Sequence, residues 1–258
     1  MTTHLVIGDP HAKPGVDNER FEWLGKFVLD RRPDVIVDIG DWADMPSLSS
    51  YDKGRRSFEG RRYSADIAAA IDAREAFNRP IEAFNARRRA NGKKQYLPRK
   101  VSTLGNHEYR IVRATDLSPE LDGTLSLDDL QHERFGWERH DYTEVVNVDG
   151  INYSHFFASG ILGRAIGGEH PAASLLKKQF ASCVAGHSHI RDFSERTRAD
   201  GSRICALVAG CFFEHWEDYA GPANDMWWRG LVMLHNVQDG VFNPEFIPLE
   251  RLRRKYGS

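Results

Sequence analysis

Short apolar runs that end in glycine or polar residues recur along the chain. The first lies at 4–8 and the second at 34–39, and each runs into a Gly-Asp pair. Between them, residues 18–31 place apolar side chains at helical spacing. A third run at 101–104 leads into another polar loop. The pattern predicts a β-α-β unit followed by a further short strand.

The second half of the chain is richer in predicted strands. Runs at 145–148 and 151–154 flank Asp149-Gly150, and such a pair between apolar runs is the strongest short signal for a hairpin. Further strands are predicted at 181–185, 203–209, 231–235 and 241–247. No repeat or linker divides the sequence, so we expect one domain over residues 1–258.

The middle of the chain carries most of the positive charge. Residues 51–100 hold 14 Lys and Arg against six Asp and Glu, although the whole chain has a net charge of -2. Residues 64–90 have a helical pattern that Pro80 interrupts, which predicts two helices. We interpret 51–100 as a basic helical insertion. Either its arginines form a solvated face, or they face phosphate groups of a nucleic acid.

Composition excludes several classes of protein. A chain of 258 residues with 41% hydrophobic residues can bury a full core, which excludes disorder. No apolar run approaches the roughly 18 residues of a membrane span, so we expect no membrane partner. The three cysteines are odd in number and lack CxxC spacing, which favours reduced thiols and a cytoplasmic location.

Metal-binding residue types collect where the strands are predicted to end. They occur in five blocks: Asp9 and His11, Asp41 and Asp44, Asn106 to Glu108, His155, and His187 and His189. In open α/β sheets, ligand sites gather beyond the carboxyl ends of strands, so these blocks can converge on one cleft. Carboxylates and an amide mixed with imidazoles supply the ligands that a pair of divalent ions needs.

The order of the blocks, DxH, GDxxD, GNHE, H and GHSH, resembles the calcineurin-like metallophosphoesterase family, including its phage-encoded and bacterial members. The resemblance covers residues 4 to about 235. It implies an α/β fold, a four-layer α/β/β/α sandwich with two mixed β-sheets. It also implies a cytoplasmic phosphoric ester hydrolase, located in the host cytoplasm if phage-encoded.

The resemblance implies a role for each matching residue. Asp9, His11 and His189 would hold one divalent ion, and Asn106, His155 and His187 the other, with Asp41 bridging them. His155 has the weakest local motif, and His140 or His170 could take its place. His107 would assist the leaving group rather than bind metal, with Asp44 orienting it, and Glu108 would support the loop. Manganese is favoured, with Fe, Zn, Co or Ni as alternatives.

The implied reaction is the attack of a metal-bridging hydroxide on a phosphate ester. Protein phosphatases of this family follow GDxxD with a phosphate-clamping arginine, whereas Met45 and Pro46 stand here. We therefore favour a phosphodiesterase that acts on nucleotides or other diesters. The alternatives are a DNA or RNA nuclease that contacts its substrate through Arg87, Arg88 and Arg89, a phosphomonoesterase, and a catalytically silent scaffold.

Overall fold

The predicted β-α-β unit is present in the computed structural model, which describes residues 1–257. Strand β1 (Thr2–Ile7) pairs in parallel with β2 (Val35–Asp38), and α1 (Glu19–Arg31) connects them. Strand β3 (Arg99–Thr103) continues the same sheet in parallel. The chain is thus a mixed α/β fold in which three consecutive parallel strands deliver their loops to one sheet edge.

Two large mixed sheets are built from these and later strands. The first has the order β13-β12-β1-β2-β3-β4, which adds β4 (Glu138–His140), β12 (Gly230–Gln238) and β13 (Val241–Pro248). The second has the order β10-β11-β9-β6-β5. Its strands are β5 (Val146–Val148), β6 (Ile151–Tyr153), β9 (Cys183–Ala185), β10 (Arg191–Thr197) and β11 (Arg203–Ala209). A small hairpin of β7 (Ala158–Ser159) and β8 (Arg164–Ala165) lies apart from both sheets.

The two sheets share one hydrophobic cluster. Val6, Val37 and Val232 of the first sheet are buried with Tyr153 and Leu207 of the second. Because successive side chains of a strand point to opposite faces, Leu5 and Ile7 of the same β1 strand belong to a different cluster. Strands that bury both faces in this way explain the nearly continuous apolar runs of the sequence.

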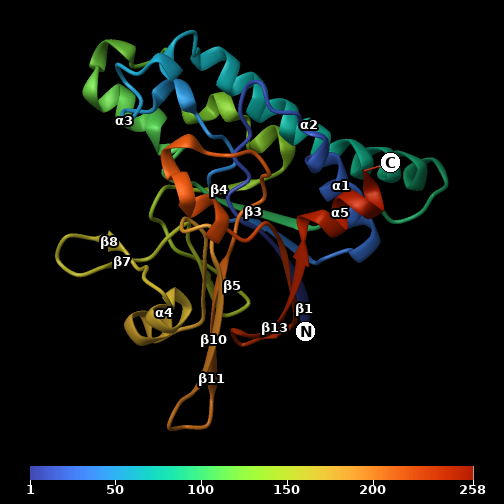
Figure 1. Cartoon of the computed structure of the whole chain (residues 1–258). Helices are drawn as coiled ribbons and strands as arrows, with labels where there is room; N and C mark the ends of the chain where they lie inside the picture. The colour runs from blue at the N-terminus through green and yellow to red at the C-terminus, as the bar shows by residue number, and fades with distance from the viewer. Residues whose placement is uncertain (258) are drawn as a thin grey trace.

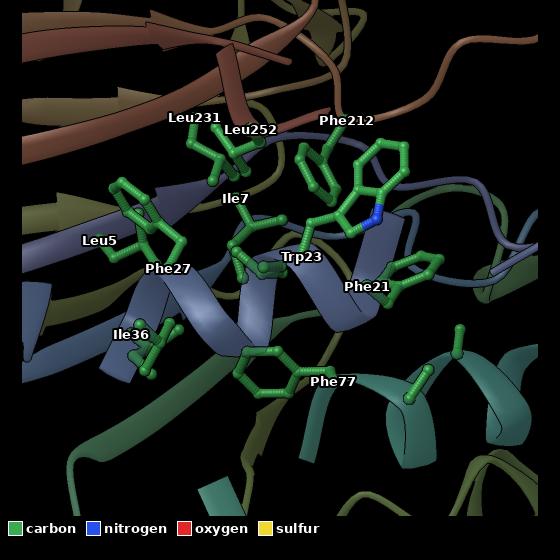
Figure 2. Close-up of a cluster of buried hydrophobic side chains, with 14 of the residues drawn as sticks. Leu5, Ile7, Phe21, Trp23, Phe27, Ile36, Phe77, Phe212, Leu231 and Leu252 are labelled. Carbon is green, nitrogen blue, oxygen red and sulfur yellow. The ribbon is translucent and has the colours of Figure 1, made fainter. Parts of the chain in front are cut away.

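Helices cover the outer faces of both sheets. On the first sheet, α1 packs with α2 (Tyr63–Ala90) and α5 (Leu249–Tyr256), and Figure 2 shows Phe21, Phe77 and Leu252 beside Ile7 in this cluster. On the second sheet lies α4 (Pro171–Gln179), whose buried face joins β9 and β11. Figure 1 shows α2 along the top and α4 on the lower side. The arrangement is compatible with an α/β sandwich.

One helix replaces the two that were predicted around Pro80. Helix α2 continues from Tyr63 to Ala90 with Pro80 inside it, so the prediction of a break was wrong. Gly25 of α1 explains the difference, because a Cβ atom there would lie 2.3 Å from the carbonyl oxygen of Phe77. The close approach of the two helices buries the apolar face of α2, which offsets the hydrogen bond that proline removes.

The two ends of the basic segment 51–100 have different surroundings. The helix α2 within it packs on α1 and the first sheet, whereas residues 51–62 form a loop that precedes it. Helix α3 (Tyr109–Leu117) follows the GNHE loop. The elements without a counterpart among the predicted ones include helices α3, α4 and α5 and strands β4, β7, β8 and β10. No helix in residues 1–257 has the length and apolar character needed to cross a membrane.

Candidate metal centre

Five loops that follow strands meet at the candidate centre. They leave β1, β2, β3, β6 and β9, as the positions of the polar blocks predicted. Asp9, His11, Asp41, His187 and His189 all have positive φ, between 33° and 68°. A positive φ is unfavourable for residues other than glycine, and residues that adopt it are concentrated at functional sites. The loops are therefore held in conformations that their local sequence does not favour.

Two glycines of the motifs allow the carboxylates to approach the neighbouring loops. A Cβ atom on Gly105 would lie 2.0 Å from Oδ1 of Asp41, and one on Gly186 would lie 2.4 Å from Oδ1 of Asp9. Both distances are far below van der Waals contact. The glycines of GNHE and GHSH are thus required by the position of a carboxylate from another strand.

The first group of ligand atoms comes from Asp9, His11 and His189. Their ligand atoms all lie within 4.8 Å of one another, and His189 Nε2 is 2.9 Å from Asp9 Oδ2. His11 and Asp9 are fully buried. Neither ring nitrogen of His11, nor Oδ1 of Asp9, has a hydrogen-bond partner among the described residues. Buried polar atoms are rarely left without a partner, so these atoms fit coordination of a cation.

The second group comes from Asn106, His155 and His187. Oδ1 of Asn106 lies 3.0 Å from His155 Nε2 and 2.9 Å from His187 Nδ1, and the two ring nitrogens are 3.3 Å apart. Nδ1 of His155 donates to the carbonyl of Ile39 at 3.0 Å, so in the neutral ring Nε2 bears only a lone pair. Lone pairs that face one another repel unless a cation lies between them. This group also fits a divalent ion.

Asp41 lies between the two groups. Its Oδ2 is 3.7 Å from Nε2 of His11 and 3.3 Å from Nε2 of His155. Burial opposes ionisation of this carboxyl, but the imidazoles of His107 and His155 outweigh burial and hold its pKa well below the usual range. Asp41 therefore presents a negative charge to both groups.

His107 faces the same centre and belongs to neither of these two groups, although its ligand atom lies within 4.8 Å of those of His11 and Asp41. Its Nδ1 donates to Oδ1 of Asp44 at 2.8 Å, which leaves Nε2 directed toward Asp41 Oδ2 at 3.8 Å. Burial disfavours the imidazolium, but Asp41 and Asp44 overcome it and raise the pKa of His107. The geometry thus gives His107 a fixed tautomer with Nε2 on the side of Asp41, as a group that exchanges protons there requires.

Glu108 joins the loops that carry these residues. Its carboxylate accepts hydrogen bonds from the backbone N–H groups of Asp41 at 3.0 Å, Ala43 at 2.8 Å and Gly105 at 2.9 Å. Burial and the nearby charges of Asp41 and Asp38 raise the pKa of Glu108 to about 7. The contacts agree with the supporting role expected for this residue.

A cavity of about 800 Å³ opens onto the centre. It is lined by His107, Asn106, His187 and His189 from the centre, and by arginines of the loop 51–62. A cavity of this size holds a small-molecule ligand. Arg87, Arg88 and Arg89 do not line it, because they lie in the last turn of α2, where Arg89 donates to Gln95 at 3.0 Å.

The alternatives to His155 lie elsewhere. His140 is on β4 and its Nδ1 pairs with Glu144 at 2.9 Å, and His170 is exposed immediately before α4. His155, by contrast, is fully buried within the second group. Of the three histidines, the structure brings only His155 to the centre.

Three cationic residues near the centre were missed by the sequence reasoning. Arg110 donates to His107 Nε2 at 3.0 Å, and Lys13 donates to Glu217 Oε1 at 2.6 Å beside Asp44. Arg20 is buried and donates to the carbonyls of Pro10 at 2.9 Å and Phe212 at 3.0 Å. The spacing of Arg110, three residues after His107 at the start of a helix, was the one signal available in the sequence.

No family model matches the chain, and no curated protein does. The geometry itself shows buried histidine and aspartate groups at distances suited to holding a metal ion.

Proposed function

We propose that the protein is a metal-dependent phosphoesterase with a dinuclear centre. The observation that carries the proposal is the position of Asp41, whose Oδ2 lies 3.7 Å from His11 and 3.3 Å from His155, ligands of two separate groups. A carboxylate between two sets of imidazole and oxygen ligands is the arrangement that a pair of divalent ions requires. Each group also has a lone-pair atom that a cation would satisfy.

Asp9, His11 and His189 would hold one ion and Asn106, His155 and His187 the other, with Asp41 shared. The mixture of carboxylate, amide and imidazole ligands suits manganese, with Fe, Zn, Co or Ni as alternatives. When bound, such ions neutralise phosphoryl oxygens and lower the pKa of a coordinated water. The sequence resembles the five motifs of the calcineurin-like metallophosphoesterases. The packing of sheets and helices described above is compatible with the four-layer sandwich that this resemblance implies.

His107 would donate the proton that the leaving oxygen needs. Its Nε2 side faces both Asp41 and the cavity, where a phosphate ester would lie. Asp44 holds Nδ1–H at 2.8 Å, so the ring cannot turn away, and its carboxylate stabilises the imidazolium. Asp44 is thus a positioning residue, and His107 is the residue that would contact substrate.

The class of phosphate ester depends on the arginines around the centre. The preference for phosphodiesters, including nucleotides, rested on the lack of an arginine beside GDxxD, but Arg110 donates to the carbonyls of Asp44 at 2.9 Å and Met45 at 3.3 Å. A nuclease that binds through Arg87, Arg88 and Arg89 gains no support from a cavity that excludes them. Three buried cysteines without disulfides agree with the proposed cytoplasmic location.

The test compares metal binding with turnover in the full-length protein. Protein stripped with a chelator and reloaded with Mn²⁺ is expected to bind about two equivalents and to hydrolyse a nitrophenyl phosphate ester. His107→Ala is expected to keep both equivalents and to lose about 10²- to 10⁴-fold in turnover. Asp41→Asn is expected to lose metal as well.

His170→Ala is the control, because His170 is exposed outside the cavity. Binding of two ions with no turnover of monoesters or diesters would contradict the proposal and favour a catalytically silent scaffold. Unchanged turnover in His107→Ala would remove His107 from the mechanism.

A further inference from the structure

Arg110 lies beside the GDxxD loop, where the local sequence has Met45 and Pro46 in place of an arginine. It lies on the first turn of α3, and Nη1 donates to the carbonyl oxygens of Asp44 at 2.9 Å and Met45 at 3.3 Å. Nη2 donates to Nε2 of His107 at 3.0 Å. The guanidinium is therefore held against both His107 and Asp44, and it lines the cavity.

The anchoring leaves part of the guanidinium free. An arginine has five N–H donors, of which two on Nη1 and one on Nη2 are used here. Among the groups that the structure describes, the Nε–H and the second Nη2–H make no hydrogen bond. The nearest carboxylate oxygen, Oδ1 of Asp44, is 3.9 Å from Nη1, which is too long for a hydrogen bond.

The other cations of the cavity are engaged differently. Lys13 donates to Glu217 at 2.6 Å, and Arg61 donates to Asp52 at 2.7 Å. Arg55 is largely exposed and 4.0 Å from Asp52, and Arg62 is exposed. Arg110 is therefore the cation that lies against His107 with a planar pair of donors still available for an anion.

We propose that Arg110 binds a terminal phosphoryl oxygen of the substrate and makes the protein selective for phosphomonoesters. This inference rests on the dinuclear phosphoesterase proposed above. A monoester dianion has three terminal oxygens, so two can face the metal groups and the third remains for the guanidinium. A diester has two terminal oxygens and one negative charge, and it leaves Arg110 without a charged partner. This proposal differs from the preference for diesters that the sequence predicted.

The contact with His107 connects binding to proton transfer. In the free protein Arg110 donates to Nε2, so Nε2 acts as an acceptor there. A phosphoryl oxygen is a stronger acceptor than a neutral imidazole and would draw the guanidinium onto the substrate, which leaves Nε2 able to carry a proton. In the reaction, water adds to phosphorus, the ester P–O bond breaks, and the electron pair stays on the leaving oxygen. The attacking water keeps one proton on the phosphate and releases the other to solvent. The leaving oxygen takes a proton from Nε2, and Nε2 takes one back from solvent, so the products are an alcohol and hydrogen phosphate.

The experiment measures phosphate binding and ester selectivity in the Mn-loaded, full-length protein. Arg110→Gln is expected to weaken the binding of inorganic phosphate, followed by calorimetry, by about 10- to 100-fold, because a charge-assisted hydrogen bond is lost. It should reduce kcat/KM for nitrophenyl phosphate by a similar factor and change kcat/KM for bis(nitrophenyl) phosphate by less than about threefold.

Arg56→Gln is the matched control, because this exposed arginine of the loop 51–62 does not line the cavity and should leave all three values unchanged. Arg110→Lys, which keeps the charge and loses the planar fork, should fall between the wild type and Arg110→Gln. Metal content and thermal unfolding of each variant show that the centre is retained.

Equal losses on monoester and diester in Arg110→Gln would overturn the inference, because they would show that Arg110 acts on His107 alone. Unchanged phosphate binding in Arg110→Gln would also overturn it. If the wild type hydrolyses neither ester but binds phosphate through Arg110, the proposed function fails and the anion site stands. If the wild type binds no phosphate, the anion site fails, whatever its activity.

Discussion

His155 donates from Nδ1 to the backbone carbonyl of Ile39 at 3.0 Å, and this bond decides which of its nitrogens faces the centre. Ile39 directly follows β2, and His155 follows β6 of the other sheet. The two sheets are therefore connected at the centre by a hydrogen bond that leaves Nε2 as a ligand atom. A histidine that ligates a metal commonly donates its other ring nitrogen in this way.

Replacement of His155 is expected to remove one ion and spare the other. His155→Ala deletes a member of the group with Asn106 and His187, so metal analysis should fall from about two equivalents to about one. His170→Ala should keep both, since His170 is exposed before α4. Retention of both ions by His155→Ala would assign this histidine a structural role instead.

Asp44→Asn is expected to slow turnover without loss of metal. The amide can still accept from Nδ1 of His107, but it no longer carries the charge that stabilises the imidazolium. We expect kcat to fall about 10- to 100-fold. Loss of the charge lowers the pKa of His107, which must be protonated to act, so the alkaline limb of the pH–rate profile should move to lower pH.

The control for Asp44→Asn is Asp52→Asn, because Asp52 lines the same cavity but pairs with Arg61 at 2.7 Å. Equal pH–rate profiles for Asp44→Asn and the wild type would exclude a role of Asp44 in setting the proton affinity of His107.

The sequence predicted the positions of the polar blocks because strand ends are marked locally. Apolar runs followed by Gly-Asp or Gly-Asn identify the carboxyl ends of parallel strands, and those ends meet at one edge. Asp9, Asp41 and Asn106 come from three adjacent strands of one sheet, and His155 and His187 come from two adjacent strands of the other. Their convergence follows from the parallel pairing of β1, β2 and β3 and of β6 and β9.

The residues that were missed depend on contacts between distant segments. Arg110 lies on a helix whose pattern carries no functional signal, and only the fold brings it against Met45. Pro80 is similar, because local rules place a break there and the close packing of Gly25 against α2 overrides them. Strand β10 is mostly polar and gains its structure from the pairing with β11, which periodicity does not reveal.

Arg20 is expected to be essential for stability. Its guanidinium is buried and donates to the carbonyls of Asp17 at 2.8 Å, Pro10 at 2.9 Å and Phe212 at 3.0 Å. Arg20→Met leaves these carbonyls without a donor, so the free energy of unfolding should fall by about 3 kcal/mol in urea titrations. Metal affinity should fall as well, because Pro10 lies between Asp9 and His11.

Arg79→Met is the control for Arg20→Met. Arg79 has an exposed side chain that reaches Glu22 at 3.4 Å, so its loss should cost less than about 0.5 kcal/mol. Similar losses in the two variants would contradict the anchoring role of Arg20.

His132 is expected to make stability depend on pH. Burial lowers its pKa to about 2, with the charges of Arg74 and Arg139 acting in the same direction. Below the ordinary value of 6.5, the unfolded chain binds a proton that the folded protein refuses. The contribution of His132 to the free energy of unfolding is therefore present above pH 6.5 and is lost as the pH falls below that value.

Urea unfolding of the wild type and His132→Leu at pH 7 and pH 5 isolates this contribution from that of the other histidines. The wild type should lose about 2 kcal/mol more than the variant over this interval, as the difference in proton binding requires. Leucine is close to histidine in size and fills the same buried space without a titratable group. Parallel pH dependence of the two proteins would show that His132 is protonated in the folded state, and that the loop before β4 admits water to its ring.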